Sequence, residues 1–133
     1  ILLRSFGTDA SVIRLRHDMD KVHLDINQAI PCALILNELV SNALKYAFPD
    51  GRNGEIWLRS RSDANRQITM TVGDNGIGLP AELNLDQTES LGLQLVNTLV
   101  RQLRGQLVIS RSGGTEYALT FTAAKTDDEG IAT

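Results

Sequence analysis

Several features are scarce or missing in this chain of 133 residues, and each shortage removes a class of protein from consideration. Cys32 is the only cysteine, so the chain cannot form an intramolecular disulfide, and no CxxC pair or Cys/His cluster is present to hold zinc. A reducing cytoplasm is therefore the expected location. The most apolar stretch, AIPCALIL, is far too short to span a bilayer, so we expect no membrane contact by this domain.

Positive charge is also in short supply. The sequence has 13 lysines and arginines against 16 aspartates and glutamates, which gives a net charge of −3 and a pI near 5.3. A protein with this balance has no general affinity for a nucleic-acid backbone, and we expect no nucleic-acid partner. The length and the 42% hydrophobic content suffice for one globular domain with a single core.

Hydrophobic periodicity predicts two helices among several strands. Apolar residues spaced by three and four predict one helix from Asn27 to about Ala47 and another over residues 91–104. Short alternating or β-branched segments predict strands over residues 12–17, 22–26, 55–60, 67–72, 106–111 and 115–122. We expect three antiparallel hairpins: residues 12–17 with 22–26, 55–60 with 67–72, and 106–111 with 115–122. Hairpins covered on one face by two amphipathic helices favour an α/β (α+β) two-layer sandwich with a mixed, mostly antiparallel sheet.

The long helix carries a polar face. Glu38, Asn42, Lys45 and Tyr46 are spaced so that they share a stripe beside the apolar one. A carboxylate, a carboxamide and an ammonium group on one stripe can position a magnesium ion and neutralise phosphate charge, although a solvated helix face has the same pattern. Asparagine is unfavourable inside a helix, so Asn37 and Asn42 indicate a demand other than helix formation.

A glycine-rich stretch, GDNGIGLP, follows one of the predicted strands. Asp74 at the strand end can accept a hydrogen bond from the exocyclic amino group of adenine, which guanine lacks at the same ring position. Gly76 and Gly78 permit close approach to the main chain. A plain turn is the alternative interpretation, but Ile77 between the glycines suits an apolar wall beside a base better than an exposed turn.

Two later motifs also have a plain structural alternative. SLGLQLV places Gly92 at the start of the second helix, where free amides can bind phosphate, although Ser90 as an N-cap explains the pattern equally well. SGGTEYALTF reads as a hairpin turn in which Thr115 is an ordinary strand residue.

Together and in this order, the motifs resemble the ATP-binding catalytic domain of sensor histidine kinases, within the GHKL ATPase superfamily, over residues 12–123. NELVSNALKY resembles the asparagine box of that family. The resemblance implies that Asn42 ligates the magnesium ion on the triphosphate and that Glu38 polarises the attacking group. Lys45 and Tyr46 match positions that contact phosphate or the nucleoside.

The remaining boxes complete the resemblance. DNGIG is similar to the first glycine box and implies an adenine pocket. SLGLQLV resembles the second glycine box, with one glycine where many relatives have more. The lid has no phenylalanine between Pro80 and Leu91 and is expected to be short. The nucleotide-contacting residues implied by these boxes are Asp74, Gly76, Ile77, Gly78, Leu79, Gly92, Leu93 and Thr115.

The resemblance implies an ATP-dependent protein-histidine kinase that uses ATP and Mg²⁺. His17 and His23 fall in or beside predicted strands, so we expect the phospho-acceptor histidine on an upstream dimerisation domain, with a response regulator receiver domain as an indirect partner. The segment LILNELVSNALKYAF resembles the corresponding segment of the histidine kinase subfamily that has a variant dimerisation region. Residues 1–11 would be the end of the upstream helical or linker region, and residues 124–133 a disordered acidic tail.

Two other functions remain open at this point. A serine/threonine kinase of the anti-sigma-factor type shares these motifs as a small complete protein. A non-catalytic module that senses nucleotide and reports it to a partner would also keep the pocket.

Overall fold

A computed structural model describes residues 2–3, 12–49, 51–77, 91–111 and 113–125. Its strands and helices are β1 (Leu2–Leu3), β2 (Ile13–Met19), α1 (Ile26–Asn42), the π-helical turn η1 (Ala43–Ala47), β3 (Gly54–Ser62), β4 (Gln67–Asp74), α2 (Leu91–Gln102), β5 (Gln106–Ser110) and β6 (Thr115–Thr122). The described strands form one sheet in the order β1-β2-β3-β4-β6-β5.

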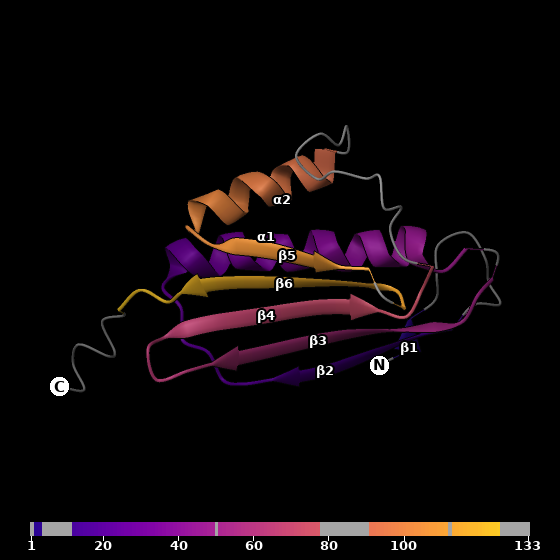
Figure 1. The fold of residues 1–133 in the computed structure, drawn as a ribbon, viewed down its shortest axis with the longest axis horizontal. Coiled ribbons are helices and arrows are strands. Elements are labelled where there is room, and N and C mark those ends of the chain that lie inside the picture. The colour runs from indigo at the N-terminus through magenta and orange to yellow at the C-terminus, as the bar shows by residue number, and fades with distance from the viewer. Residues whose placement is uncertain (1, 4–11, 50, 78–90, 112, 126–133) are drawn as a thin grey trace.

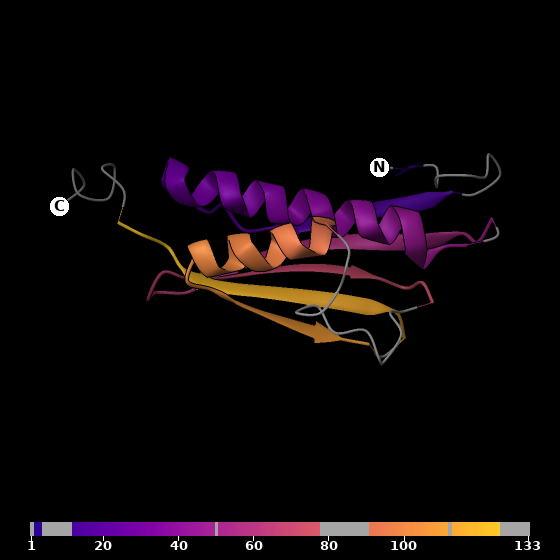
Figure 2. The ribbon, with the colours of Figure 1, turned by 90° about the horizontal axis from the view of Figure 1, so that it is seen from above.

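Both helices cover the same face of the sheet, as Figures 1 and 2 show. The largest fully buried side chains come from both layers and include Ile13, Ile35, Leu39, Ile56, Val72, Val96, Leu119 and Phe121. The inward residues of β6 alternate with outward ones, as a strand with one buried face requires. The predicted two-layer sandwich is confirmed, and so is the mixed, mostly antiparallel sheet.

One predicted strand is wrong. Residues 22–26 form no strand; α1 begins at Ile26, and Asp25 is its N-cap, with a side-chain oxygen that accepts a hydrogen bond from the Gln28 N–H at 3.0 Å. The expected first hairpin is therefore absent from the described residues, and β2 pairs in parallel with β3 instead. The β-branched composition of the segment suggested a strand, but the capping interaction and the apolar period of the helix outweigh it.

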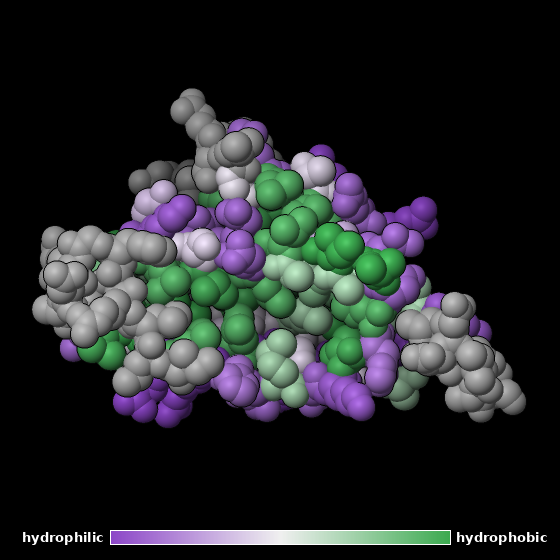
Figure 3. Space-filling view, turned by 180° about the vertical axis from the view of Figure 1, so that it is seen from behind, coloured by the Kyte–Doolittle hydropathy of each residue, from purple (hydrophilic) through white to green (hydrophobic). Residues whose placement is uncertain are grey.

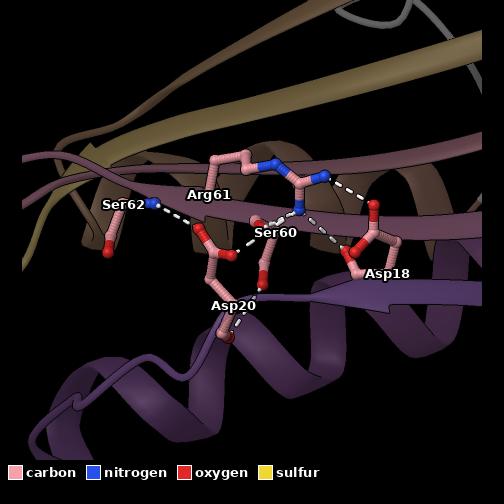
Figure 4. A network of polar contacts seen from close by, with 5 residues as sticks. All are labelled: Asp18, Asp20, Ser60, Arg61 and Ser62. Carbon is pink, nitrogen blue, oxygen red and sulfur yellow. Dashed lines mark hydrogen bonds and ion pairs between the residues drawn. The ribbon is translucent and has the colours of Figure 1, made fainter.

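A polar network joins the end of β2 to β3 (Figure 4). The Arg61 guanidinium contacts the Asp18 carboxylate and also lies 3.8 Å from Asp20. The Ser60 hydroxyl donates to the backbone carbonyl of Asp20 at 3.1 Å. The arginine lowers the pKa of the Asp18 carboxyl through its hydrogen bond and its charge. These contacts hold the chain against β3 where it leaves the sheet toward α1.

The two ends of the chain are only partly described. Leu2–Leu3 pair antiparallel with β2, so these two residues form a strand. The backbone N–H of Ala124 donates to the side-chain oxygen of Gln28 at 2.8 Å, which ties the chain after β6 to the first turn of α1. The proposed domain boundaries stay predictions, and most of both terminal segments lies outside the described residues. In the described part, no helix is long and apolar enough to cross a membrane.

The long helix ends in an unusual way. It continues past Asn42 as the π-helical turn η1, and Phe48 follows it with non-helical backbone angles. The predicted end near Ala47 is confirmed, but the π geometry was not predicted. Such turns are rare and occur often at functional sites. Here the turn contains Lys45 and Tyr46, two of the residues that the sequence singled out.

Candidate functional site

Several of the motif residues lie at one end of the molecule. In Figures 1 and 2, the end of η1, the end of β4, and the start of β6 all point toward the same end. The strand register places Asp74 directly opposite Thr115. The fold therefore gathers the polar helix face, the first glycine motif and the threonine of the last hairpin, which are far apart in sequence.

Asp74 is the buried polar centre of this region. Its residue is only 5% exposed, and one carboxylate oxygen accepts hydrogen bonds from the backbone N–H of Gly76 at 2.9 Å and of Thr115 at 3.4 Å. The other carboxylate oxygen accepts no hydrogen bond from any described residue. Because this oxygen is not among the fully buried unpaired atoms of the described residues, it keeps access to solvent and can orient a ligand that donates an N–H.

The titration of this carboxyl reflects its surroundings. Burial raises the pKa of Asp74 above its ordinary value, while the two backbone N–H groups and the positive charge of Arg52 oppose the increase. Tyr117, two residues after Thr115 on β6, is also buried. Its burial, assisted by the negative charge of Asp74, raises the pKa of Tyr117 to about 12, so its hydroxyl stays protonated at neutral pH.

The first glycine motif packs against the end of the long helix. The Ile77 N–H donates to the carbonyl oxygen of Ala47 at 2.9 Å. A side chain on Gly76 would overlap that same carbonyl, so the close approach predicted for this glycine is made by the protein itself. Ile77 is exposed, which leaves its apolar side chain available as one wall of a pocket.

The polar face of the long helix is accessible. Glu38 and Asn42 are half-buried, whereas Lys45 and Tyr46 are exposed. Within the described ranges, the side chains of these four residues form no hydrogen bond or ion pair with one another or with other residues. Their polar atoms are therefore open to solvent or to a ligand, as the functional interpretation of this face requires.

The second glycine motif is described only from the start of α2. Gly92 lies in the first turn of that helix and is partly buried, while the Leu93 side chain is buried in the domain. Leu93 can therefore approach a phosphate only with its backbone. Gly78, Leu79 and the predicted lid between Pro80 and Leu91 lie outside the described residues.

Four further residues shape the site and were missed in the sequence. Asn75 and Glu55 exchange two hydrogen bonds: the Asn75 N–H donates to the Glu55 carbonyl at 3.2 Å, and the Glu55 N–H donates to the Asn75 side-chain oxygen at 2.8 Å. The Arg52 guanidinium donates to the Asn75 carbonyl at 3.3 Å. Gly114 has a φ of +125° and packs on the backbone of Asp74. The paired glycines before Thr115 were the only sequence signal for any of these roles.

Comparison with known proteins decides the family. Residues 27–125 match the family described as histidine kinase-, DNA gyrase B- and HSP90-like ATPases. The chain belongs to this ATPase family. The relationship that the motifs suggested is thereby confirmed, and the match includes α1, the first glycine motif and β6.

The relatives within this ATPase family are sensor kinases. The chain is 37% identical over 111 residues to sensor histidine kinase PdtaS of Mycobacterium tuberculosis, covering 80% of this chain and 22% of that protein. It is 32% identical to blue-light-activated histidine kinase 2 of Erythrobacter litoralis, covering 76% of this chain and 29% of the relative. The chain thus spans about a quarter of the length of these curated relatives.

A solved structure agrees with these relatives. The histidine kinase domain from the Erythrobacter litoralis EL346 blue-light activated histidine kinase superposes with a TM-score of 0.79 at 28% identity, covering 94% of this chain and 56% of that one. The chain is therefore a histidine kinase ATPase domain in fold and ancestry.

The residues present fit a nucleotide and its metal ion. Asp74, which is 5% exposed, offers the unbonded carboxylate oxygen that an adenine amino group needs as an acceptor. No group of three or more His, Cys, Asp or Glu side chains in the described part could hold a metal on its own. Magnesium in phosphoryl-transfer sites needs only one or two protein oxygens, because phosphates and water complete its shell. The accessible Asn42 carboxamide satisfies that smaller requirement.

Proposed function

We propose that this domain binds Mg-ATP and transfers the γ-phosphate to a histidine on a separate dimerisation domain, as the catalytic domain of a sensor histidine kinase. The observation that carries the proposal is Asp74. It is buried, held by the Gly76 and Thr115 N–H groups, and left with one oxygen free. A carboxylate that is held in place and keeps one acceptor oxygen unbonded suits the exocyclic amino group of adenine.

The surrounding residues would complete the adenine pocket. Ile77 contributes an exposed apolar surface, and its backbone is fixed by the bond to Ala47. Thr115 pairs with Asp74 and would support the base, and we expect Gly76, Gly78 and Leu79 to contact the nucleotide. Tyr46, which is exposed on η1, contacts the nucleoside. GTP would present a carbonyl oxygen to the Asp74 carboxylate and would be repelled.

The polar helix face would serve the triphosphate. The Asn42 carboxamide oxygen holds the magnesium ion, and Lys45 with the backbone at Gly92 and Leu93 contacts the phosphates. The ion, when bound there, would supply positive charge to the phosphate oxygens. Glu38, one turn before Asn42, polarises the attacking imidazole. Catalysis by this domain then rests on positioning and charge neutralisation.

The phosphate acceptor would lie on another domain. His17 is exposed on β2, and His23 is exposed between β2 and α1, so neither lies on a helix. The relatives named above are sensor kinases, which favours this reaction over the serine/threonine kinase and sensing-module alternatives. A response regulator receiver domain would take the phosphate from the histidine afterwards. Because the reaction uses ATP, we place the domain in the cytoplasm.

The proposal is tested by calorimetric titration of the purified chain with ATP and with GTP, with and without Mg²⁺. We expect selective binding of ATP that Mg²⁺ strengthens, together with little hydrolysis, because the acceptor histidine is missing. Equal binding of GTP would contradict base reading by Asp74, and rapid steady hydrolysis by the isolated chain would contradict the need for a partner.

Replacing Asn42 with alanine is expected to remove the contribution of Mg²⁺ to ATP affinity. The variant loses the carboxamide oxygen that ligates the ion but keeps the adenine pocket, so ATP binds with the same weak affinity in the presence and absence of Mg²⁺. Titration of both proteins in Mg²⁺ and in EDTA measures the effect. Asn37→Ala, an exposed asparagine five residues earlier on the same helix, is the matched control. Magnesium dependence that survives in Asn42→Ala would refute the role.

A further inference from the structure

The outward surface of α1 carries a row of exposed apolar side chains. Ile26, Ile30 and Leu34 are 69%, 55% and 43% exposed, although each is a large aliphatic residue. They are spaced by four residues and so form one ridge along the helix. The buried residues Cys32, Ile35 and Leu39 face the opposite way, into the core.

The part of α1 that carries this ridge is uncharged. From Ile26 to Asn37, α1 contains no acidic or basic residue. Figure 3, which views the molecule from the helix side, shows apolar side chains gathered along α1 on this face. Exposed apolar patches of this kind on a globular domain mark surfaces that another molecule covers. The absence of charge excludes a partner that binds through ion pairs with the ridge.

The ridge leads into the proposed catalytic face. Continuing the same spacing of four residues, Ile26, Ile30 and Leu34 are followed by Glu38 and Asn42. Leu34 and Glu38 are therefore neighbours on one side of the helix, about 6 Å apart along its axis. A partner helix that packs along the apolar part of this row would therefore also lie next to the carboxylate of Glu38.

We propose that Ile26, Ile30 and Leu34 form the docking ridge for a helix of the histidine-bearing partner domain, and that docking places the acceptor imidazole beside Glu38. The inference rests on the proposed function, because it assigns a surface to the partner which that function requires. Ridges of every fourth residue pack into grooves of a second helix, which fits an apolar helical partner. The chain also covers only 56% of the solved Erythrobacter litoralis histidine kinase domain, so that domain has further chain available for such a contact.

A second copy of this chain fits the ridge less well. In a two-fold symmetric contact centred on Ile30, Leu34 of one copy would lie against Ile26 of the other. Glu38 of one copy would then lie opposite residue 22 of the other, which precedes α1, so the second copy places no helix alongside Glu38. The partner domain is the occupant that uses both the apolar row and its polar continuation.

Cysteine labelling measures whether the ridge is covered. Ile30→Cys and the control Val108→Cys, whose native side chain is 56% exposed on β5, are treated with a maleimide in the isolated chain and in the protein made from its complete reading frame. The native Cys32 is buried, and burial raises the pKa of its thiol to about 11, so its own labelling is slow.

The expected result is similar labelling of the two cysteines in the isolated chain, and at least a tenfold slower reaction at position 30 alone in the complete protein. Equal rates at position 30 in both proteins would overturn the proposal. Slow labelling of position 30 already in the isolated chain would also overturn it. In the complete protein, a labelling rate at position 30 that falls as protein concentration rises would identify a second copy as the occupant and overturn the proposal. A slow rate that does not depend on concentration would identify another segment of the complete protein.

A functional measurement adds a second readout. In the complete protein, Ile30→Asp is expected to lower histidine phosphorylation at least tenfold, whereas Val108→Asp leaves it unchanged. Both isolated variants should keep the melting temperature and ATP affinity of the native chain, because neither residue is in the nucleotide site. Unchanged phosphorylation in Ile30→Asp would overturn the docking role. Failure of the native chain to bind ATP would refute the proposed function instead, and the labelling comparison would still decide the docking surface.

Discussion

The Asp74→Asn variant is expected to bind ATP about 10- to 100-fold more weakly, while its nucleotide-free form becomes more stable at neutral pH. The asparagine oxygen can still accept from Gly76 and Thr115. Its amide nitrogen, however, would face the adenine amino group with a donor where the native carboxylate has an acceptor. The loss of a charge-assisted hydrogen bond of about 1.5–3 kcal/mol gives the expected range.

The gain in stability follows from the direction of the pKa shift. Burial raises the pKa of Asp74 above its ordinary value of 3.8, so the folded state holds this proton more tightly than the unfolded state does. Native stability contributed by the group is complete below about pH 3.8 and is lost as the pH rises through the folded pKa. The neutral asparagine avoids that loss. The difference in unfolding free energy between variant and native protein should therefore be largest at neutral pH and disappear near pH 3.

Asp63→Asn is the matched control. Asp63 is exposed in the turn after β3, and one of its carboxylate oxygens also accepts two backbone N–H groups, from Asn65 and Gln67, each at 2.9 Å. The same chemical change at this exposed position should leave ATP affinity and the free energy of unfolding at pH 7 unchanged. Native ATP affinity in Asp74→Asn would show that Asp74 does not contact the base. A lower stability of that variant at pH 7 would show that burial does not dominate its energetics.

The Gly114→Ala variant is expected to lose about 3 kcal/mol or more of folding stability and to lose ATP binding with it. Gly114 has a φ of +125°, a conformation that other residues rarely adopt, and an added Cβ would overlap the carbonyl oxygen of Asp74. Both atoms in this clash are main-chain or attached directly to it, so no flexible side chain can move away. Relief requires separating β6 from β4 where Thr115 pairs with Asp74.

The neighbouring glycine separates the clash from the backbone strain. Gly113 also has a positive φ, of +70°, but an added Cβ would meet no atom within 4 Å. Gly113→Ala should therefore cost only the conformational strain of about 1–2 kcal/mol. Urea unfolding of the two variants beside the native chain measures the difference. Similar losses for both would mean that the contact with Asp74 is relieved without cost.

Local patterns predicted most of the elements correctly. The second helix was expected over residues 91–104 and spans Leu91–Gln102, and the hairpins of β3 with β4 and of β5 with β6 formed as expected. The error was residues 22–26, where composition favoured a strand and a capped helix begins at Ile26. Composition describes single residues, whereas an N-cap depends on the bond between Asp25 and Gln28, so the cap decided the structure there.

The candidate site divides in a similar way. The sequence could predict that Glu38 and Asn42 share one side of the helix, because helical periodicity relates residues that are close in sequence. The need for glycine at position 76 was predicted only in part. The sequence predicted a close approach to its main chain, but only the structure shows that the approaching group is the carbonyl of Ala47. The role of Gly114 against Asp74 had no comparable sequence pattern, because the two residues meet only across paired strands.

The sequence by itself determined the family and the two-layer fold class and supplied the candidate polar residues of the proposed site, since periodicity, turn chemistry and motif order are properties of neighbouring residues. Only the tertiary structure decided that β2 pairs in parallel with β3, that Asp74 is buried with one oxygen free, and that Ile26, Ile30 and Leu34 stay exposed. Pairing partners and burial depend on which distant segments come together in space, and no local pattern specifies that.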